Sequence, residues 1–176
     1  MITVPLTALA ATLAGQIGTI GTVQEPIIYG TDDRIQWFEV PDGGLTRVKS
    51  FGAALVPWSR LRVTTAGVDL SASPLGIARN LCAASRFASE PSAASCSAVL
   101  VDDDAVLTAG HCFDAGANCR DTAIVFDFLE AAPGALGVTP DSFFGCRTLG
   151  RPAATDTGDW ALIELDRKVV APRAPV

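Results

Sequence analysis

Several residue types are scarce in this sequence, and their scarcity restricts what the protein can be. It contains one histidine, His111, and only 18% of its 176 residues are charged. Its 13 Lys and Arg residues form no cluster and are outnumbered by 19 Asp and Glu residues, which gives a net charge of −6. Because nucleic-acid affinity comes largely from cations that displace phosphate counterions, this balance argues against a DNA or RNA partner.

Cysteine pairs with C-x-x-C spacing are also absent. Five cysteines without that spacing, accompanied by one histidine, do not supply the ligand set of a zinc site. We therefore expect no metal and no cofactor. Disulfide bonds explain the cysteines better, and because they persist in oxidising compartments they predict a secreted or periplasmic protein. The odd number leaves one cysteine free, bonded to another molecule, or paired with a residue outside this sequence.

Positive charge is missing from the N-terminus. Residues 1–24 carry no charged side chain, and residues 2–14 have the apolar character of a signal-peptide core. The alternatives are an ordinary N-terminal extension and a membrane span, but Pro5 and several glycines dilute the hydrophobicity that a span requires. We predict a signal peptide or leader over residues 1–24 and no stable membrane span.

Heptads and internal repeats are absent from the rest of the chain, which instead alternates short apolar runs with Gly, Pro and Asp. This pattern is typical of an all-β barrel or sandwich, and a hydrophobic content of 49% is enough to build a core. We predict an N-terminal extension with short strands over residues 25–90, in which residues 74–81 are a candidate helix. Residues 91–176 are predicted to form a barrel.

A hairpin is the best-defined unit. Strands are predicted at Ser97–Val101 and Ala105–Thr108, and the three aspartates between them form a charged tip without the alternating spacing of a calcium loop. Cys96 and Cys112 lie at equal distances from residue 104, so antiparallel pairing would bring them opposite one another. A disulfide there would fix the backbone beside the histidine.

The pairing of the other cysteines is open. Cys82, Cys119 and Cys146 allow three internal pairs with one cysteine left over, or a bond to a residue beyond the sequence. A weak preference goes to Cys82 with Cys119, because both flank the hairpin.

His111 ends the segment Thr-Ala-Gly-His, which begins at the last residue of the second hairpin strand. A histidine, with an ordinary pKa of about 6.5, suits a general base near neutral pH, and a carboxylate on its other ring nitrogen would hold its tautomer and orientation. Gly158-Asp159-Trp160-Ala161-Leu162 lies downstream and introduces a predicted strand. In this order, and with Cys96 and Cys112, the two motifs resemble the trypsin-like serine proteases, including secreted bacterial glutamyl-endopeptidase-like peptidases.

The resemblance implies an all-β fold, namely the N-terminal β-barrel of a two-barrel trypsin-like protease. It implies that His111 is the catalytic base and Asp159 the carboxylate that orients it, with the Cys96–Cys112 disulfide beside them. Asp156 and Asp166 are rival carboxylates, but Asp156 lies in a polar connector and Asp166 stands next to an arginine.

The nucleophile is the part of the machinery that the sequence lacks. The chymotrypsin order is His, Asp and then Ser, and no serine here lies in Gly-Asp-Ser-Gly-Gly or Gly-x-Ser-x-Gly. We expect the serine and its oxyanion hole beyond Val176 and expect the chain as given to be inactive. Trp160 is predicted to be a core residue rather than a substrate contact.

The sequence therefore predicts a serine endopeptidase that cleaves protein or peptide substrates through an acyl-enzyme, present as its N-terminal part. One alternative is a truncated or degenerate, non-catalytic protease-like module that serves in protein interactions. Another is an unrelated disulfide-stapled adhesive domain. Substrate preference and oligomeric state are left open.

Overall fold

The computed structural model describes residues 33–41, 46–64, 67–114, 117–132, 135–150 and 158–176. The chain divides into two compact units, Met1–Arg34 and Ile35–Val176, and the structural account concerns the second. The predicted leader at residues 1–24 lies outside the described residues. No helix within the described ranges is both long and apolar enough to cross a membrane.

Short strands dominate the second unit, and its helices are brief. In chain order the elements are η1 (Trp37–Glu39), α1 (Thr46–Phe51), β1 (Gly52–Pro57), η2 (Trp58–Arg60), β2 (Leu61–Thr64), β3 (Gly67–Leu70), β4 (Ser73–Pro74), α2 (Leu75–Ala78), β5 (Pro91–Ser92), β6 (Cys96–Asp102), β7 (Ala105–Thr108), η3 (Gly110–Phe113), η4 (Cys119–Asp121), β8 (Thr122–Phe126), β9 (Glu130–Ala132), β10 (Ala135–Leu136), η5 (Pro140–Ser142), β11 (Phe143–Gly150) and β12 (Ala161–Leu165).

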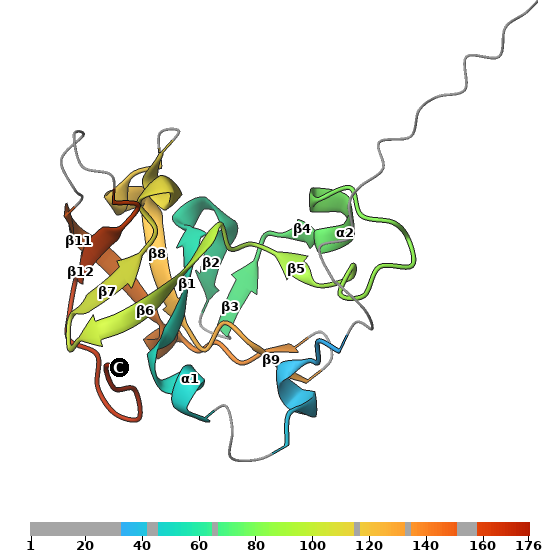
Figure 1. The fold of residues 1–176 in the computed structure, drawn as a ribbon, viewed down its shortest axis with the longest axis horizontal. Coiled ribbons are helices and arrows are strands. Elements are labelled where there is room, and N and C mark those ends of the chain that lie inside the picture. The colour runs from blue at the N-terminus through green and yellow to red at the C-terminus, as the bar shows by residue number, and fades with distance from the viewer. Residues whose placement is uncertain (1–32, 42–45, 65–66, 115–116, 133–134, 151–157) are drawn as a thin grey trace, which may run out of the picture. The chain divides into compact units, whose positions relative to one another are not determined.

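Six antiparallel strands of the described chain close into a barrel in the order β1-β6-β7-β12-β11-β8 (Figure 1). β1 closes the barrel because it pairs with β6 along one edge and with β8 along the other. This strand comes from the segment 25–90 that the sequence analysis assigned to an extension, so the barrel also uses chain that precedes residue 91. Closure leaves the sheet without free edges, which is how small all-β domains avoid edge-to-edge association.

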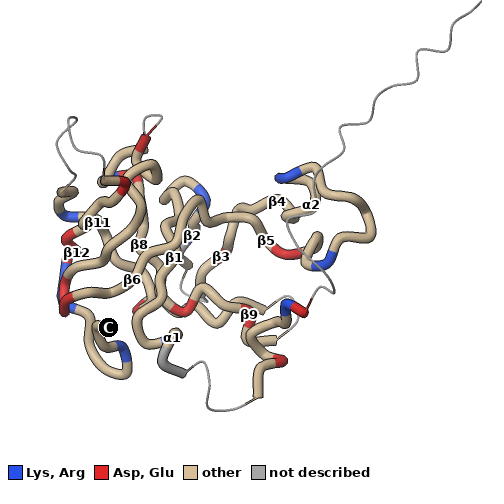
Figure 2. The backbone as a smooth tube through the Cα atoms, in the orientation of Figure 1, with Lys and Arg blue, Asp and Glu red and all other residues tan. Residues whose placement is uncertain are grey.

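Two apolar clusters hold the barrel. Alternate strand residues point inward, and Leu55, Leu100, Ile124 and Ile163 are at most 1% exposed in the interior cluster. β8 is buried on both faces, because its other residues pack into a second cluster on the outside of the barrel. Figure 2 shows the barrel strands as mostly uncharged chain, with acidic and basic residues gathered at strand ends and loops.

The segment before the hairpin covers this outer face. β2 pairs with β3, and β4 pairs with β5. Apolar side chains of Leu61, Val68 and Leu70 pack against the second cluster and shield it from water. The helix expected within residues 74–81 is present as α2. The extension predicted from sequence is therefore part of the packed unit.

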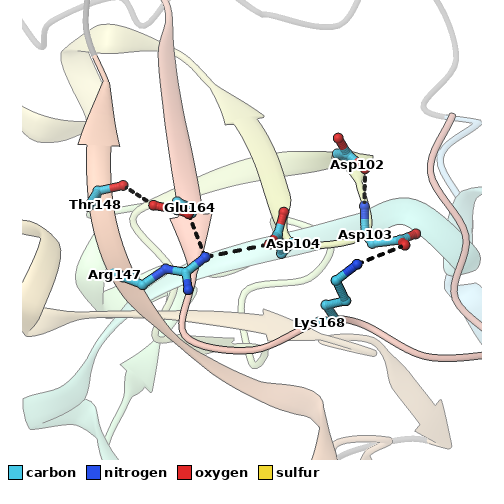
Figure 3. Close-up of polar contacts among 7 residues, drawn as sticks. All are labelled: Asp102, Asp103, Asp104, Arg147, Thr148, Glu164 and Lys168. Atoms are coloured by element: carbon cyan, nitrogen blue, oxygen red, sulfur yellow. Dashed lines mark hydrogen bonds and ion pairs between the residues drawn. The ribbon is translucent and has the colours of Figure 1, made fainter.

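Exposed ion pairs join the hairpin tip to β11 and to the chain after β12 (Figure 3). Arg147 Nη2 lies 2.5 Å from a carboxylate oxygen of Glu164 and 3.5 Å from one of Asp104, and Lys168 Nζ lies 3.7 Å from Asp103. The hydrogen bond donated by the Thr148 hydroxyl, followed by the charge of Arg147, holds the pKa of Glu164 below its ordinary value. Because these groups are exposed, their pairing adds little stability.

The C-terminal segment returns across the barrel and is anchored by Arg173. Its Nη2 donates to Asp127 Oδ2 at 2.5 Å, and the side chains are only 11% and 20% exposed. Arg173 also lies over the Phe126 ring at 5.4 Å, and the same Nη2 lies 3.4 Å from the hydroxyl of the fully buried Ser142. Backbone N–H groups of Ala174 and Val176 donate to carbonyls of α1 and β6, which completes the attachment.

A disulfide joins Cys119 to Cys146, so the preference for Cys82 with Cys119 was wrong. Cys119 stands just before β8, and Cys146 lies on β11, which pairs with the start of β8. Antiparallel pairing therefore brings the two Cα atoms to 5.2 Å, within the range that a disulfide needs. Cys82 is exposed and has a free thiol.

Candidate active site

Neighbouring strands β7 and β12 bring the two predicted catalytic residues together. β7 pairs with β12 so that Thr108 faces Ala161. His111 follows the end of β7 in the short helix η3, and Asp159 stands just before β12. Because the strands are antiparallel, the end of one meets the start of the other. Residues 48 positions apart in sequence are thus placed in contact.

The contact between them is made by two hydrogen bonds. His111 Nδ1 lies 2.7 Å from Asp159 Oδ2, and the backbone N–H of His111 donates to Asp159 Oδ1 at 2.8 Å. Both oxygens of one carboxylate are thus used on one residue, which fixes the ring and its backbone together. The side chains are 65% and 59% exposed, so the pair is open to solvent.

The ionisation of Asp159 sets the tautomer of the ring. The hydrogen bond from the His111 side chain, followed by that from its backbone N–H, holds the pKa of Asp159 below 3.8. An ionised carboxylate only accepts hydrogen bonds, so near neutral pH Nδ1 must be the donor. Neutral His111 then carries its lone pair on Nε2, to which no described residue hydrogen-bonds. His111 is therefore a base whose Nδ1 is held by a hydrogen bond and whose Nε2 is open.

Small and polar residues around the pair allow this close approach. A Cβ added to Gly110 would lie 3.1 Å from both Asp159 Oδ1 and the carbonyl oxygen of Trp160, which is tighter than ordinary packing. The Thr108 hydroxyl donates to the backbone carbonyl of Ser97 at 2.7 Å and ties β7 to β6 just before the site. No role was predicted from sequence for either Thr108 or Gly110. The signals present were a glycine directly before the only histidine and a hydroxyl ending an apolar strand.

A disulfide joins Cys96 to Cys112 beside the histidine, as the hairpin geometry predicted. Their Cα atoms are 6.1 Å apart and the S–S bond is 2.00 Å long. The two sulfurs and a ring nitrogen of His111 all lie within 4.8 Å of one another, a spacing that a metal ion would fit. However, sulfurs that are bonded to each other are not thiolates, and thiolates are the form of cysteine that binds a metal. In the oxidised protein the cluster is a staple and not a metal centre.

Residues 79–174 match the family model described as Trypsin. This chain belongs to the trypsin family. The predicted all-β, trypsin-like barrel is confirmed, and trypsin-family enzymes are serine protease hydrolases that act on peptides. No curated protein sequence matches the chain.

Two solved structures are similar to this trypsin-family chain. One is the secreted serine protease VesC from Vibrio cholerae, with 17% identity and a TM-score of 0.43 over 72% of this chain and 20% of that protein. The other is the VesB protease of Vibrio cholerae, with 14% identity and a TM-score of 0.39 over 68% of this chain and 28% of that protein. The chain thus spans under a third of either protein.

One of the two rival carboxylates of this trypsin-family chain, Asp166, is described and makes its ion pair away from the histidine. Asp166 follows β12 and pairs with Arg167 at 3.1 Å, and Asp156 lies outside the described residues. The assignment of Asp159 as the orienting carboxylate stays a prediction, and its geometry suits the role.

The expectation that Trp160 is a core residue was wrong. Its side chain is 43% exposed, whereas Ala161, Ile163 and Leu165 are fully buried. Alternation along β12 places Leu162 outward, at 40% exposure, and Trp160 has the same parity. The strand is covered on one face only. Leu107 pairs with Leu162 across the strands and is 41% exposed, so an apolar face adjoins the His–Asp pair.

Proposed function

We propose that this chain is the part of a secreted serine endopeptidase that supplies the general base, His111, and its orienting carboxylate, Asp159. The observation that carries the proposal is the 2.7 Å contact between Nδ1 and Oδ2, which leaves Nε2 open. Cys96–Cys112 and Cys119–Cys146 support export, because disulfides persist in oxidising compartments.

The proposed reaction uses His111 as base and then as acid. A serine hydroxyl attacks the carbonyl carbon of the scissile peptide bond, and Nε2 takes the hydroxyl proton. The resulting imidazolium gives this proton to the nitrogen of the leaving amine as the C–N bond breaks, which leaves an acyl ester on the serine. Water, deprotonated by the same Nε2, then attacks the ester, and the proton returns to the serine oxygen.

The serine is proposed to come from chain beyond Val176. Because the nucleophile must reach hydrogen-bond distance of Nε2, the segment that carries it must lie against this side of the barrel. The exposed apolar residues Leu107, Trp160 and Leu162 lie on or beside the strands that carry the His–Asp pair, and they suit such a covering segment. In a full-length product, Leu162→Glu should lower kcat/KM while leaving the unfolding of the 176-residue chain unchanged.

The decisive experiment labels the natural full-length product with a fluorophosphonate, which reacts with an activated serine. We expect labelling of the wild-type protein, none of the 176-residue chain, and loss of labelling in His111→Ala. Asp159→Asn should lower kcat by about 10⁴-fold, because the amide favours the wrong tautomer. The matched control is Asp166→Asn, which changes a carboxylate outside the pair and should leave kcat unchanged.

The non-catalytic alternative gives different results in the same experiment. A degenerate interaction module would show no labelling even at full length. Labelling that survives in His111→Ala would contradict the proposed base.

A further inference from the structure

A polar cavity of about 370 Å³ lies away from the His–Asp pair, between η2, the chain before β4, the end of α2 and the chain around β5. Its lining contains two arginines and four serines, which are Arg60, Arg79, Ser71, Ser73, Ser92 and Ser95. No carboxylate is part of the lining. The cavity therefore presents an excess of hydrogen-bond donors and positive charge.

Arg60 is fixed in the wall. Its Nη1 donates to the backbone carbonyls of Ser92 at 3.2 Å and Ala93 at 3.0 Å. A guanidinium has five N–H donors in a fork that matches an oxyanion, so two bonds from one nitrogen leave others available. Part of the ordering that a ligand would require has therefore already been made by the fold.

Arg79 supplies the second cation and is positioned by its backbone, whose N–H donates to the carbonyl of Leu75 at 2.9 Å. Within the described part of the chain, its guanidinium has no ion-pair partner. The side-chain hydroxyls of Ser71, Ser73 and Ser92 likewise have no described hydrogen-bond partner. Unused donors among the lining residues of one cavity suit an anionic ligand.

Arg60 and Arg79 have no ion pair within the described residues, although the chain carries a net charge of −6. Arg147, Arg167 and Arg173 each pair with a carboxylate within 3.5 Å. Of the nearby acids, Glu90 accepts a hydrogen bond from Gln36, and Asp69 lies opposite Arg62 in the register of β2 and β3. Neither acid lines the cavity that holds the two arginines.

We propose that this cavity binds a small oxyanionic ligand, in which a carboxylate or a phosphate contacts Arg60 and Arg79 and an attached polar group meets the serines. The volume is at the small end of the range for small-molecule pockets and exceeds what one inorganic anion fills. All six lining residues named above lie before the hairpin, and three of them precede the family match, which begins at residue 79. The site is independent of the proposed peptidase chemistry.

The test titrates the 176-residue protein with succinate, inorganic phosphate and the neutral succinamide at constant ionic strength, followed by amide chemical shifts. We expect saturable shifts confined to the cavity segments with succinate or phosphate and none with succinamide. Arg79→Gln should weaken binding by about tenfold, the value of one charged hydrogen bond. The matched control is Arg62→Gln, which removes the same charge from neighbouring β2 and should leave affinity unchanged.

Each outcome decides the proposal. Saturation by succinate alone identifies a carboxylate ligand, and saturation by phosphate alone identifies a phosphate ligand. Equal weakening by Arg62→Gln and Arg79→Gln, or shifts with succinamide that match those with succinate, would overturn the site. So would shifts that never saturate. Arg60→Gln also removes two wall hydrogen bonds, so Arg79→Gln, whose side chain has no described partner, is the deciding variant.

Discussion

Two carboxylate contacts of similar length occupy opposite environments. His111 Nδ1 and Asp159 Oδ2 are 2.7 Å apart with side chains 65% and 59% exposed, whereas Arg173 and Asp127 are 2.5 Å apart with side chains 11% and 20% exposed. The exposed pair keeps a ring nitrogen open toward solvent and adds little stability. The buried pair attaches the C-terminal segment to the barrel and leaves an uncompensated charge if broken. The two contacts therefore have similar distances but different roles.

The largest effect should come from the staple beside the exposed pair. Replacing both Cys96 and Cys112 with serine opens a loop with a sequence separation of 16 residues. The chain-entropy model gives a loss of about 3 kcal/mol of unfolding free energy for a loop of this size. Urea denaturation measures it. A negligible loss would contradict this prediction. It would mean that the His–Asp pair itself, and not the disulfide, keeps the site rigid.

The next effect tests the buried pair. Arg173→Gln leaves Asp127 partly buried without its cation, and we expect a loss of about 2 kcal/mol, below the range for fully buried pairs because Asp127 keeps some contact with water. Thermal and urea unfolding measure this loss. Arg147→Gln is the matched control, since it breaks ion pairs whose members are exposed, and it should leave stability within error of wild type.

A much smaller effect is expected at the exposed pair. Asp159→Asn keeps the shape of the side chain but removes its charge, and the unfolding free energy at pH 7 should change little compared with Arg173→Gln, because solvent screens the interaction. In the same variant, the ¹⁵N shifts of the His111 ring should report a changed tautomer balance. A large loss of unfolding free energy in Asp159→Asn would contradict the prediction that the exposed pair adds little stability.

The smallest effect is a pH dependence of the unfolding free energy that is limited to acidic pH. The pKa of Asp159 is lower in the folded protein than its ordinary 3.8, chiefly through the hydrogen bond from the His111 side chain. The contribution of ionised Asp159 to the unfolding free energy is therefore fully present above pH 3.8. It declines as the pH falls from 3.8 toward the lower pKa of the folded protein. The stability difference between wild type and Asp159→Asn should narrow over that window. A difference that widens on acidification would contradict the assigned direction.

Local pattern made much of the site predictable. The hairpin strands, its charged tip and the Cys96–Cys112 bond followed from alternation and from the symmetry of the two cysteines about residue 104. The proximity of His111 and Asp159 was predicted only through the resemblance of two motifs, because nothing local to either motif specifies the other. The open Nε2 and the close approach at Gly110 required the coordinates.

Errors arose where long-range closure decides the outcome. Cys119 pairs with Cys146 because β8 and β11 are neighbours in the barrel, and strand order is not encoded in cysteine spacing. Trp160 is exposed because β12 is covered on one face only, which depends on what packs outside it. β1 joins the barrel from within the expected extension because closure needs a strand between β6 and β8.

By itself, the sequence determined the all-β character and the stapled hairpin, because these depend on side-chain chemistry and short-range spacing. The roles of His111 and Asp159 were predicted through the resemblance of two motifs to a known family. Only the tertiary structure decided which strands meet beyond the hairpin, that Cys119 joins Cys146, and which arginines are left with or without a carboxylate. The physical reason is that each of these depends on loop closure between distant segments, and packing of the whole barrel selects among closures that spacing alone leaves nearly equivalent.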